Sequence, residues 1–187
     1  GTPRLLLNSK SSLFPEGIAN SSGLVGKNLM FPPYAWVNGV FDEPLKGYMG
    51  PGGCCLWSQE FYEPDKSGEF VRGYTMEITR GWWSVTTGLT GMASGSIPWG
   101  AGHHEAYRSI FDKTAGMVVI CEDLPEEHNT VTLDPELVDS NGIPAPKLNY
   151  TLSENSLRML AHGTARGEEA LLAAGASKVS SDFPVVN

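Results

Sequence analysis

The sequence has no run of lysine and arginine and no apolar stretch long enough to cross a bilayer. Among its 187 residues, 13 are Lys or Arg and 21 are Asp or Glu, which gives a formal net charge of −8 at pH 7. Binding to nucleic acid or to an anionic membrane depends on clustered positive charge. The run Leu5–Leu7 is far shorter than the roughly 20 apolar residues that a membrane-spanning helix needs. We therefore expect neither nucleic acid nor a membrane as a partner.

Cysteine is scarce, which excludes a disulfide framework. The three cysteines are Cys54, Cys55 and Cys121, and none has the Cys-x-x-Cys spacing of a zinc or redox motif. We expect three reduced, buried thiols, which favours a reducing compartment. The choice between cytoplasm and periplasm stays open.

Three catalytic signatures are also missing. No Gly-x-Gly-x-x-Gly follows a predicted strand, so these residues contain no dinucleotide-binding turn. No Gly-x-Ser-x-Gly elbow of a serine hydrolase is present. The pair His103-His104 lacks the His-Glu-x-x-His spacing, and adjacent histidines on a helix point about 100° apart. We predict no metal site.

The residues that are present predict short elements, because 22 glycines and 13 prolines favour turns. Alternating polarity predicts a strand over 70–79, and the apolar run before Glu122 predicts a central strand over 116–123. Further strands are expected within 30–41, 130–133 and 147–152, with a turn at Asn141-Gly142 between the last two. Helices are expected at 4–9, at 103–115 with Gly116 as the stop, and at 153–174. Residues 44–69, 81–102 and 177–187 are expected to be irregular.

Strands joined by hairpins, with helices gathered at the ends, indicate an α+β fold. No alternation of strand, helix and parallel strand is visible in the sequence. We therefore predict an antiparallel sheet flanked by helices.

Three clusters are candidates for chemistry. The tryptophan-rich segment 81–102 is equally suited to line an apolar pocket or to cover a core. Acidic residues follow the predicted central strand, and paired carboxylates can do acid–base work, although a solvated turn is the more ordinary role. These residues are Glu122, Asp123, Glu126 and Glu127. His162, in "HGTARG", lies inside the predicted helix 153–174, so we expect its likeness to a catalytic signature to be chance.

The segments "GTPRLLLNS" and "SSGLVGKNLM" carry the most specific pattern in the sequence. In order and spacing they resemble two segments of the glucose–methanol–choline (GMC) family of flavin-dependent oxidoreductases. The matching residues are Gly1, Pro3, Leu5, Leu6, Leu7, Ser9, Leu24, Val25, Gly26, Asn28 and Leu29. The stretches 120–156 and 168–176 resemble the substrate-domain strands and helix of that family. The resemblance spans nearly the whole chain and is closest to branches acting on sugar acids and related alcohols.

The resemblance implies an FAD-dependent enzyme that oxidises an alcohol or sugar. In the family a hydride passes from the carbinol carbon to the flavin, while a histidine accepts the hydroxyl proton. Residues 1–29 would be a remnant of the FAD-binding domain with its connecting loop. Residues 30–187 would be the substrate-binding domain, truncated before the catalytic segment. The Gly-rich FAD-binding core and the catalytic histidine are expected to lie outside the chain, so we predict no catalytic residue within it and no turnover by it alone.

The resemblance also implies site residues. Gly26 and Asn28 are expected close to FAD, although Phe31 and Pro32 replace the acid and histidine that follow in the family. The substrate-side candidates are Tyr74, Trp82, Trp83, His103 and Glu122. Without the FAD-binding core, the run Leu5–Leu7 is expected to be disordered, repacked or sticky unless another chain covers it.

Other classes of protein remain open. A stand-alone sugar or sugar-acid binding module would reuse the predicted sheet without redox chemistry. A subunit would complete its site with a second chain that supplies the FAD-binding core. A small hydrolase would use Glu122 and Asp123.

Overall fold

The computed structural model describes residues 1–50, 53–63, 69–81 and 83–182. The chain forms two compact units. The smaller unit comprises residues 1–32 and 123–153, and the larger one comprises residues 33–122 and 154–187. The hairpin region after residue 122 thus groups with the N-terminal segment. The predicted assignment of residues 1–29 to an FAD-binding domain and 30–187 to a substrate domain stays a prediction.

The larger unit is built on an antiparallel sheet of five strands in the order β2-β3-β4-β1-β7. The strands are β1 (Tyr34–Val40), β2 (Cys54–Ser58), β3 (Tyr74–Thr79), β4 (Thr114–Cys121) and β7 (Lys178–Asp182). The apolar strand β4 lies at the centre, as its sequence predicts. The α+β fold with an antiparallel sheet flanked by helices is confirmed.

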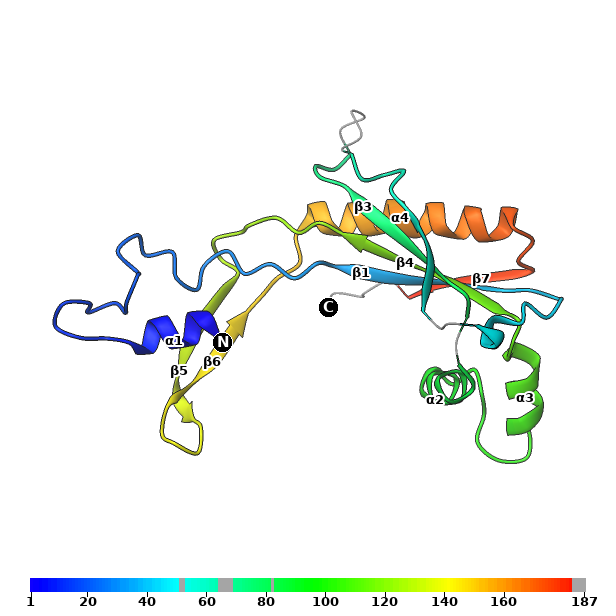
Figure 1. The fold of residues 1–187 in the computed structure, drawn as a ribbon, viewed down its shortest axis with the longest axis horizontal. Helices are drawn as coiled ribbons and strands as arrows, with labels where there is room; N and C mark the ends of the chain where they lie inside the picture. The colour runs from blue at the N-terminus through cyan, green and yellow to red at the C-terminus, as the bar shows by residue number, and fades with distance from the viewer. Residues whose placement is uncertain (51–52, 64–68, 82, 183–187) are drawn as a thin grey trace. The chain divides into compact units, whose positions relative to one another are not determined.

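Helix α4 (Glu154–Ala173) packs along one face of this sheet (Figure 1). Its apolar stripe provides Met159 and Leu160, both fully buried, and a glycine lets the helix approach the strands. A Cβ at Gly163 would lie 2.4 Å from a methyl of Val119 on β4. The helix ends before Gly175, whose φ of +98° suits the left-handed turn after a C-terminus.

Two further helices and a short 3-10 turn belong to the larger unit. They are α2 (Ser84–Ser94), α3 (His103–Ile110) and η1 (Gly47–Met49). An aromatic stack joins α3 to η1: the ring of Phe111 lies 5.2 Å from that of Tyr107 and 5.5 Å from that of Tyr48. This stack fixes the loop that leads into β4.

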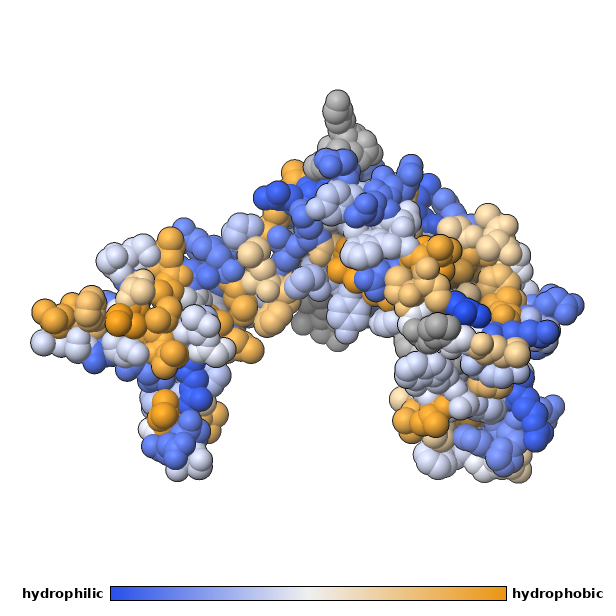
Figure 2. Space-filling view, in the orientation of Figure 1, coloured by the Kyte–Doolittle hydropathy of each residue, from blue (hydrophilic) through white to orange (hydrophobic). Residues whose placement is uncertain are grey.

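The smaller unit consists of α1 (Thr2–Asn8) and the hairpin β5 (Thr130–Val138) and β6 (Pro144–Asn149). The predicted turn is present, because Gly142 has a φ of +75° and donates its N–H to Asp139. Residues 1–32 and 123–153, all of which the structure describes, contain no buried hydrophobic side chain. Leu5 is 67% exposed, and Figure 2 shows apolar side chains gathered on the surface of this unit. The run Leu5–Leu7 is helical here, with Leu6 and Leu7 half-buried.

Four predictions of local structure are wrong. Residues 44–69 contain strand β2, and residues 81–102 contain helix α2. Helix α3 ends at Ile110, and Gly116 lies inside β4. The segment after Gly175 contains strand β7, which pairs with β1. Strands β2 and β7 are stabilised by pairing with β3 and β1, although their own sequences favour a turn or a loop.

The expectation of three buried thiols is also wrong. Cys121 is buried in β4, whereas Cys54 and Cys55 are exposed. These two residues lie on β2, which is the edge strand of the sheet. An edge strand is covered by a neighbour on one side only, so its side chains stay accessible.

Candidate functional site

The sheet of the larger unit has one covered face and one open face. Along β1 the burial alternates: Ala35, Val37 and Gly39 are buried, whereas the even-numbered residues between them are half-buried. The buried set faces α4, since a Cβ at Gly39 would meet Leu171 and a Cβ at Gly167 on α4 would meet Val37. Even-numbered residues of β1 therefore point to the other face of the sheet.

A cavity of about 710 Å³ lies on this open face. Strand β1 contributes Trp36 and Asn38, and strand β7 contributes the polar series Lys178, Ser180 and Asp182. The register supports a shared face, because Trp36 pairs with Asp182 and Asn38 pairs with Ser180. Hydroxyl, amide and charged groups thus line the sheet side of the cavity together with Trp36 and Val40.

Helix α2 forms another wall of this cavity and presents its polar side to it. The lining residues from this helix are Thr87, Thr90, Gly91 and Ser94. Val85 and Leu89 lie on the opposite side of the helix and are 70% and 60% exposed. A helix on a closed apolar core turns its apolar side inward. Helix α2 therefore adds hydroxyl-bearing side chains to the wall of the cavity and leaves its apolar side exposed.

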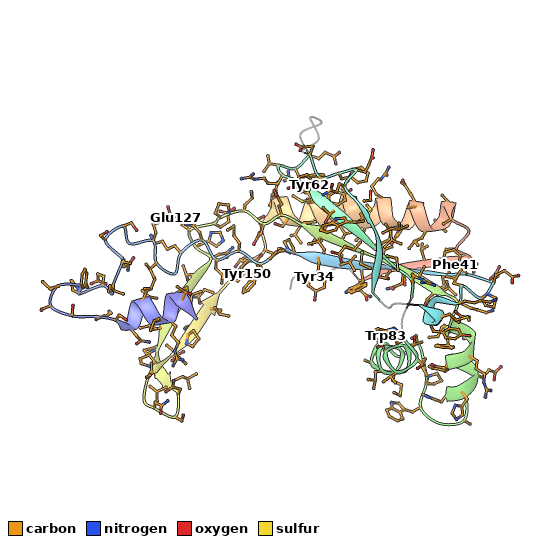
Figure 3. All side chains as sticks on the ribbon, viewed as in Figure 1. Tyr34, Phe41, Tyr62, Trp83, Glu127 and Tyr150 are labelled. Carbon is orange, nitrogen blue, oxygen red and sulfur yellow. The ribbon has the colours of Figure 1, made fainter. Side chains whose placement is uncertain are left out.

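The predicted substrate-side residues lie at separate places in the larger unit, and Trp82 lies outside the described residues. Tyr74 on β3 is buried on the covered face, and its hydroxyl is 2.8 Å from Nδ1 of His162 on α4. Trp83 precedes α2 and is 61% exposed (Figure 3). His103 begins α3, with its Nδ1 3.2 Å from the carbonyl oxygen of Pro98.

Glu122, the remaining candidate, follows β4 and lies 3.9 Å from the guanidinium of Arg72. Among the described residues, no hydrogen bond or ion pair joins any two of the predicted substrate-side residues. Their roles toward a substrate stay predictions.

Sequence reasoning missed the residues that line the open face. The sequence pattern does not single out Asn38, Ser180 or Asp182. It predicts no strand over β7, and it gives no pairing register for β1. A signal was available in the alternation Lys178, Ser180, Asp182, which puts three polar side chains on one face of a strand.

The acidic cluster after β4 has a structural role in part. Asp123 accepts hydrogen bonds from the hydroxyl of Tyr150 at 2.7 Å and from the backbone N–H of Phe31 at 3.1 Å. Burial and this hydrogen bond both raise the pKa of Tyr150. Asp123 therefore fastens the start of the hairpin region to the end of the N-terminal segment. A hydrolytic role for Glu122 and Asp123 gains no support from these contacts.

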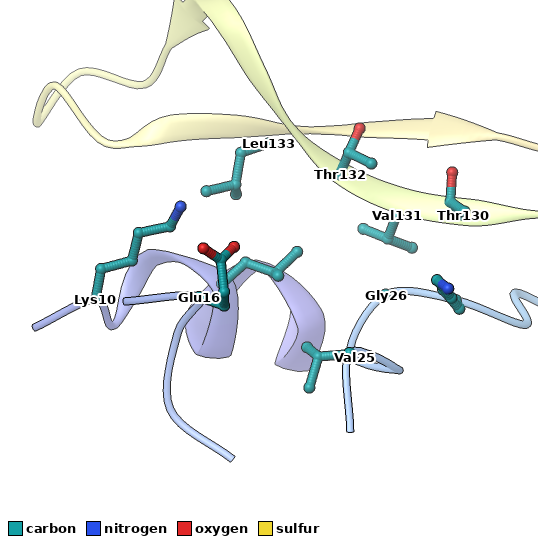
Figure 4. Close-up of a pocket in the computed structure, with 11 residues that line it drawn as sticks. Lys10, Glu16, Val25, Gly26, Thr130, Val131, Thr132 and Leu133 are labelled. Atoms are coloured by element: carbon teal, nitrogen blue, oxygen red, sulfur yellow. The ribbon is translucent and has the colours of Figure 1, made fainter. Parts of the chain in front are cut away.

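The predicted FAD-side residues Gly26 and Asn28 lie in a tight turn of the smaller unit. Both have positive φ values, +85° and +56°. The N–H of Val131 on β5 donates to the carbonyl oxygen of Gly26 at 2.6 Å, so the turn is fixed against the hairpin. A cavity of about 290 Å³ opens beside it, lined by Leu7, Lys10, Glu16, Val25 and residues 130–133 among others (Figure 4).

This cavity is too small for an entire FAD. Its volume is at the lower end of the range of about 300–1,000 Å³ in which single drug-sized ligands bind. The sequence contains no Gly-rich dinucleotide-binding turn. The cavity beside Gly26 could therefore contact one part of a flavin cofactor, and the absence of an FAD-binding core from this chain stays a prediction.

The described residues contain neither a cluster of metal-ligating side chains nor a helix that could cross a membrane. No group of three or more His, Cys, Asp and Glu side chains in the described ranges is arranged to hold a metal ion. None of the helices in this part of the chain combines the length and apolarity that a bilayer crossing requires.

Comparison with known proteins finds relatives that align along most of the chain. The chain is 38% identical over 188 aligned residues to the 2-methyl-1,2-propanediol dehydrogenase of Mycolicibacterium austroafricanum, covering all of this chain and 34% of that protein. It is 31% identical over 163 residues to the fructose dehydrogenase large subunit of Gluconobacter japonicus, covering 82% of this chain and 27% of that subunit. The chain is homologous to part of GMC-type oxidoreductases.

A third GMC-type relative is the paromamine 6'-oxidase of Streptomyces fradiae, with 27% identity over 187 residues, 95% of this chain and 30% of that protein. The chain thus spans about a third of the length of these curated relatives. No family model matches the sequence. The resemblance to GMC-type oxidoreductases is confirmed by relatives that align along nearly the whole chain.

Proposed function

We propose that this chain is the substrate-binding portion of a flavin-dependent oxidoreductase that acts on a polyhydroxylated alcohol or a sugar. The open sheet face carries the proposal, because its cavity of about 710 Å³ combines hydroxyl, amide and charged groups with the apolar side chains of Trp36, Val40 and Ile110. The relatives are named for a diol, a sugar and paromamine. A polyhydroxylated ligand can satisfy many of these polar groups at once.

The residues of this chain would bind and orient the substrate. Ser180 and Asp182 on β7 offer hydrogen bonds to ligand hydroxyls, and Trp36 offers an apolar ring beside them. GMC-type oxidoreductases usually use FAD, which would accept the hydride from the carbinol carbon. Because the cavity beside Gly26 is too small for an entire FAD, its binding core and the proton acceptor would lie outside this chain.

The test uses the protein encoded by the complete reading frame that contains this chain, purified without added cofactor. We expect a flavin absorbance spectrum that bleaches under anaerobic conditions when 2-methyl-1,2-propanediol, fructose or paromamine is added. A protein that has no flavin spectrum even after incubation with FAD, or whose flavin none of these compounds reduces, would contradict the proposal.

A matched pair of variants tests the location of the site. Ser180 and Ser181 are neighbours on β7, but only Ser180 lines the cavity, and successive side chains on a strand point to opposite faces. Ser180→Ala should raise KM for the best substrate by roughly fivefold to tenfold, because one hydrogen bond is lost. Ser181→Ala should leave KM unchanged. Equal KM values in both variants would place the substrate elsewhere.

A second candidate function is a binding module without redox activity. It is favoured by a single observation: the chain holds a polar cavity but no dinucleotide-binding turn. Isothermal titration calorimetry separates the two candidates. Saturable binding of fructose or the diol by a protein that takes up no FAD would support the binding module.

A further inference from the structure

The centre of the open sheet face has a glycine where its neighbours have polar side chains. Gly116 on β4 pairs with Thr79 on β3 and with Asn38 on β1. Asn38 in turn pairs with Ser180 on β7. These four residues form one row across the sheet, and residues in such a row point to the same face.

Gly116 allows the two flanking side chains to lean over it. A Cβ at this position would lie 3.0 Å from Oγ1 of Thr79 and 3.2 Å from Oδ1 of Asn38. The hydroxyl of Thr79 already donates to the carbonyl oxygen of Gly116 at 3.2 Å, so Thr79 is held in place. Because Gly116 has no Cβ, the side chain of Asn38 can lie over it, beside the Thr79 side chain that this hydrogen bond holds. We call this position of Asn38 its seat.

The carboxamide of Asn38 is available to a ligand in the cavity. Asn38 lines the cavity, and its side chain is engaged in no hydrogen bond with the part of the chain that the structure describes. A carboxamide carries both a donor and an acceptor, so it can pair with a hydroxyl that itself donates and accepts. The site thus offers a positioned partner for one ligand hydroxyl.

A ligand without that hydroxyl would cover the carboxamide and leave it without a partner. The cost of an unpaired polar group makes such sites reject analogues that lack one hydroxyl much more strongly than apolar pockets reject a missing methylene.

We propose that Asn38, seated over Gly116, is a specificity-determining residue that recognises a second hydroxyl of the substrate. The site then selects vicinal diols and sugars over monohydric alcohols. This inference rests on the proposed function, because it assumes that the open face binds the substrate.

The test compares two compounds that differ by a single hydroxyl: 2-methyl-1,2-propanediol and 2-methyl-1-propanol. Both have the same oxidisable CH2OH group. In the flavin-loaded protein we expect kcat/KM to favour the diol by about a hundredfold. Asn38→Leu removes the carboxamide at similar volume and should reduce this preference to below about tenfold, mainly through KM for the diol. Asn38→Asp keeps the shape of the side chain and loses the donor, so it should reduce the preference for the diol in part. This variant replaces Asn38→Leu in the test if the leucine variant fails to fold.

Gly116→Ala tests the seat itself, with Gly39→Ala as its matched control. Both place a methyl on a neighbouring strand of the same sheet. A Cβ at Gly39 meets Ala176 at 3.1 Å on the covered face, so that change should lower Tm and leave the diol preference intact. Gly116→Ala should lower the preference, since the new methyl displaces Asn38.

Calorimetric binding of the diol to the protein with its flavin photoreduced under argon gives a readout without turnover. There Asn38→Leu should weaken diol affinity by about tenfold or more. The inference is overturned if the wild-type preference for the diol is below about tenfold. It is equally overturned if Asn38→Leu lowers kcat/KM for the two alcohols by the same factor, or if diol affinity is unchanged. A protein whose flavin neither these alcohols nor any sugar reduces fails the proposed function, and the inference falls with it.

Discussion

The hydroxyl of Tyr74 on β3 lies 2.8 Å from Nδ1 of His162 on α4, which ties the covered face of the sheet to its helix. The ring of Phe61 stacks on Tyr74 with centroids 5.1 Å apart, and Phe70 contacts the histidine ring at 5.4 Å. Burial, reinforced by Cys121, raises the pKa of the Tyr74 phenol, so the hydroxyl stays protonated at neutral pH. The tautomer of His162 decides which of the two groups donates in this hydrogen bond.

Tyr74→Phe should lower the free energy of unfolding by about 1 kcal/mol, because it removes the hydroxyl and keeps the stacked ring. Urea denaturation of the protein measures the change. Tyr62→Phe is the control, since Tyr62 is 49% exposed and should tolerate the change. His162→Ala should cost less in the Tyr74→Phe background than in the wild type. Identical costs in the two backgrounds would show that the hydrogen bond contributes nothing.

Two helical glycines should respond to alanine in opposite directions. Alanine normally stabilises a helix by about 1 kcal/mol relative to glycine. At Gly163 on α4, however, a Cβ would lie 2.4 Å from Val119 and 3.2 Å from the ring of Tyr74, so Gly163→Ala should destabilise the protein. At Gly88 on α2 the nearest atom is 3.8 Å away, so Gly88→Ala should raise Tm. Thermal denaturation measures the Tm of both variants. A Tm that rises in both would contradict the close packing of α4 on the sheet.

The elements that could be predicted are those whose own residues specify them. The apolar run of β4, the turn glycine at Gly142 and the stripe of α4 before Gly175 are local signals. Each was confirmed in kind: burial acts on the apolar residues of β4 and α4 that carry the pattern, and the φ of +75° at Gly142 suits a turn.

The missed elements depend on tertiary contacts that the local sequence does not show. Helix α2 is rich in Gly, Ser and Thr, yet Gly91 leaves room for Ile97, which is buried with 1% of its surface exposed. Strand β7 pairs with β1 across more than 130 residues of sequence. The polar residues of the open face gain meaning only from that pairing, so the candidate site could not be derived from the sequence alone.

Replacement of Gly26 by alanine should strongly destabilise the smaller unit. Its φ of +85° is unfavourable for other residues, and a Cβ would lie 2.2 Å from the backbone oxygen of Val131. Gly23 has a φ of +69°, and a Cβ built there would have no atom within 4 Å. Its replacement by alanine therefore measures the cost of the positive φ without a steric clash. Gly23→Ala should lower the free energy of unfolding by about 1 kcal/mol, and Gly26→Ala should lower it by more. Chemical denaturation measures both, and equal losses would contradict the tight contact between this turn and β5.

The contact between α1 and the hairpin should weaken in acid. Arg4 donates to Oδ2 of Asp139 at 2.8 Å and to the carbonyl oxygen of Pro144 at 2.7 Å. The hydrogen bond from Arg4, followed by those from the backbone N–H groups of Asn141 and Ile143, holds the pKa of Asp139 below its ordinary value. A carboxylate with a lowered pKa stabilises the folded state above its ordinary pKa, and this contribution disappears as the pH falls through the folded-state pKa.

Asp139→Asn should therefore loosen Arg4 at neutral pH, whereas the wild type should loosen only in acid. The Nε–H resonance of Arg4 in 1H–15N spectra reports the contact, because it shifts when the guanidinium is released. Asp134→Asn is the control: the pKa of Asp134 is lowered mainly by the N–H groups of Leu137 and Glu136, with no link to α1. That variant should keep the Arg4 resonance of the wild type at pH 7. If the wild-type resonance does not move between pH 7 and strongly acidic solution, the carboxylate does not hold α1 on the hairpin.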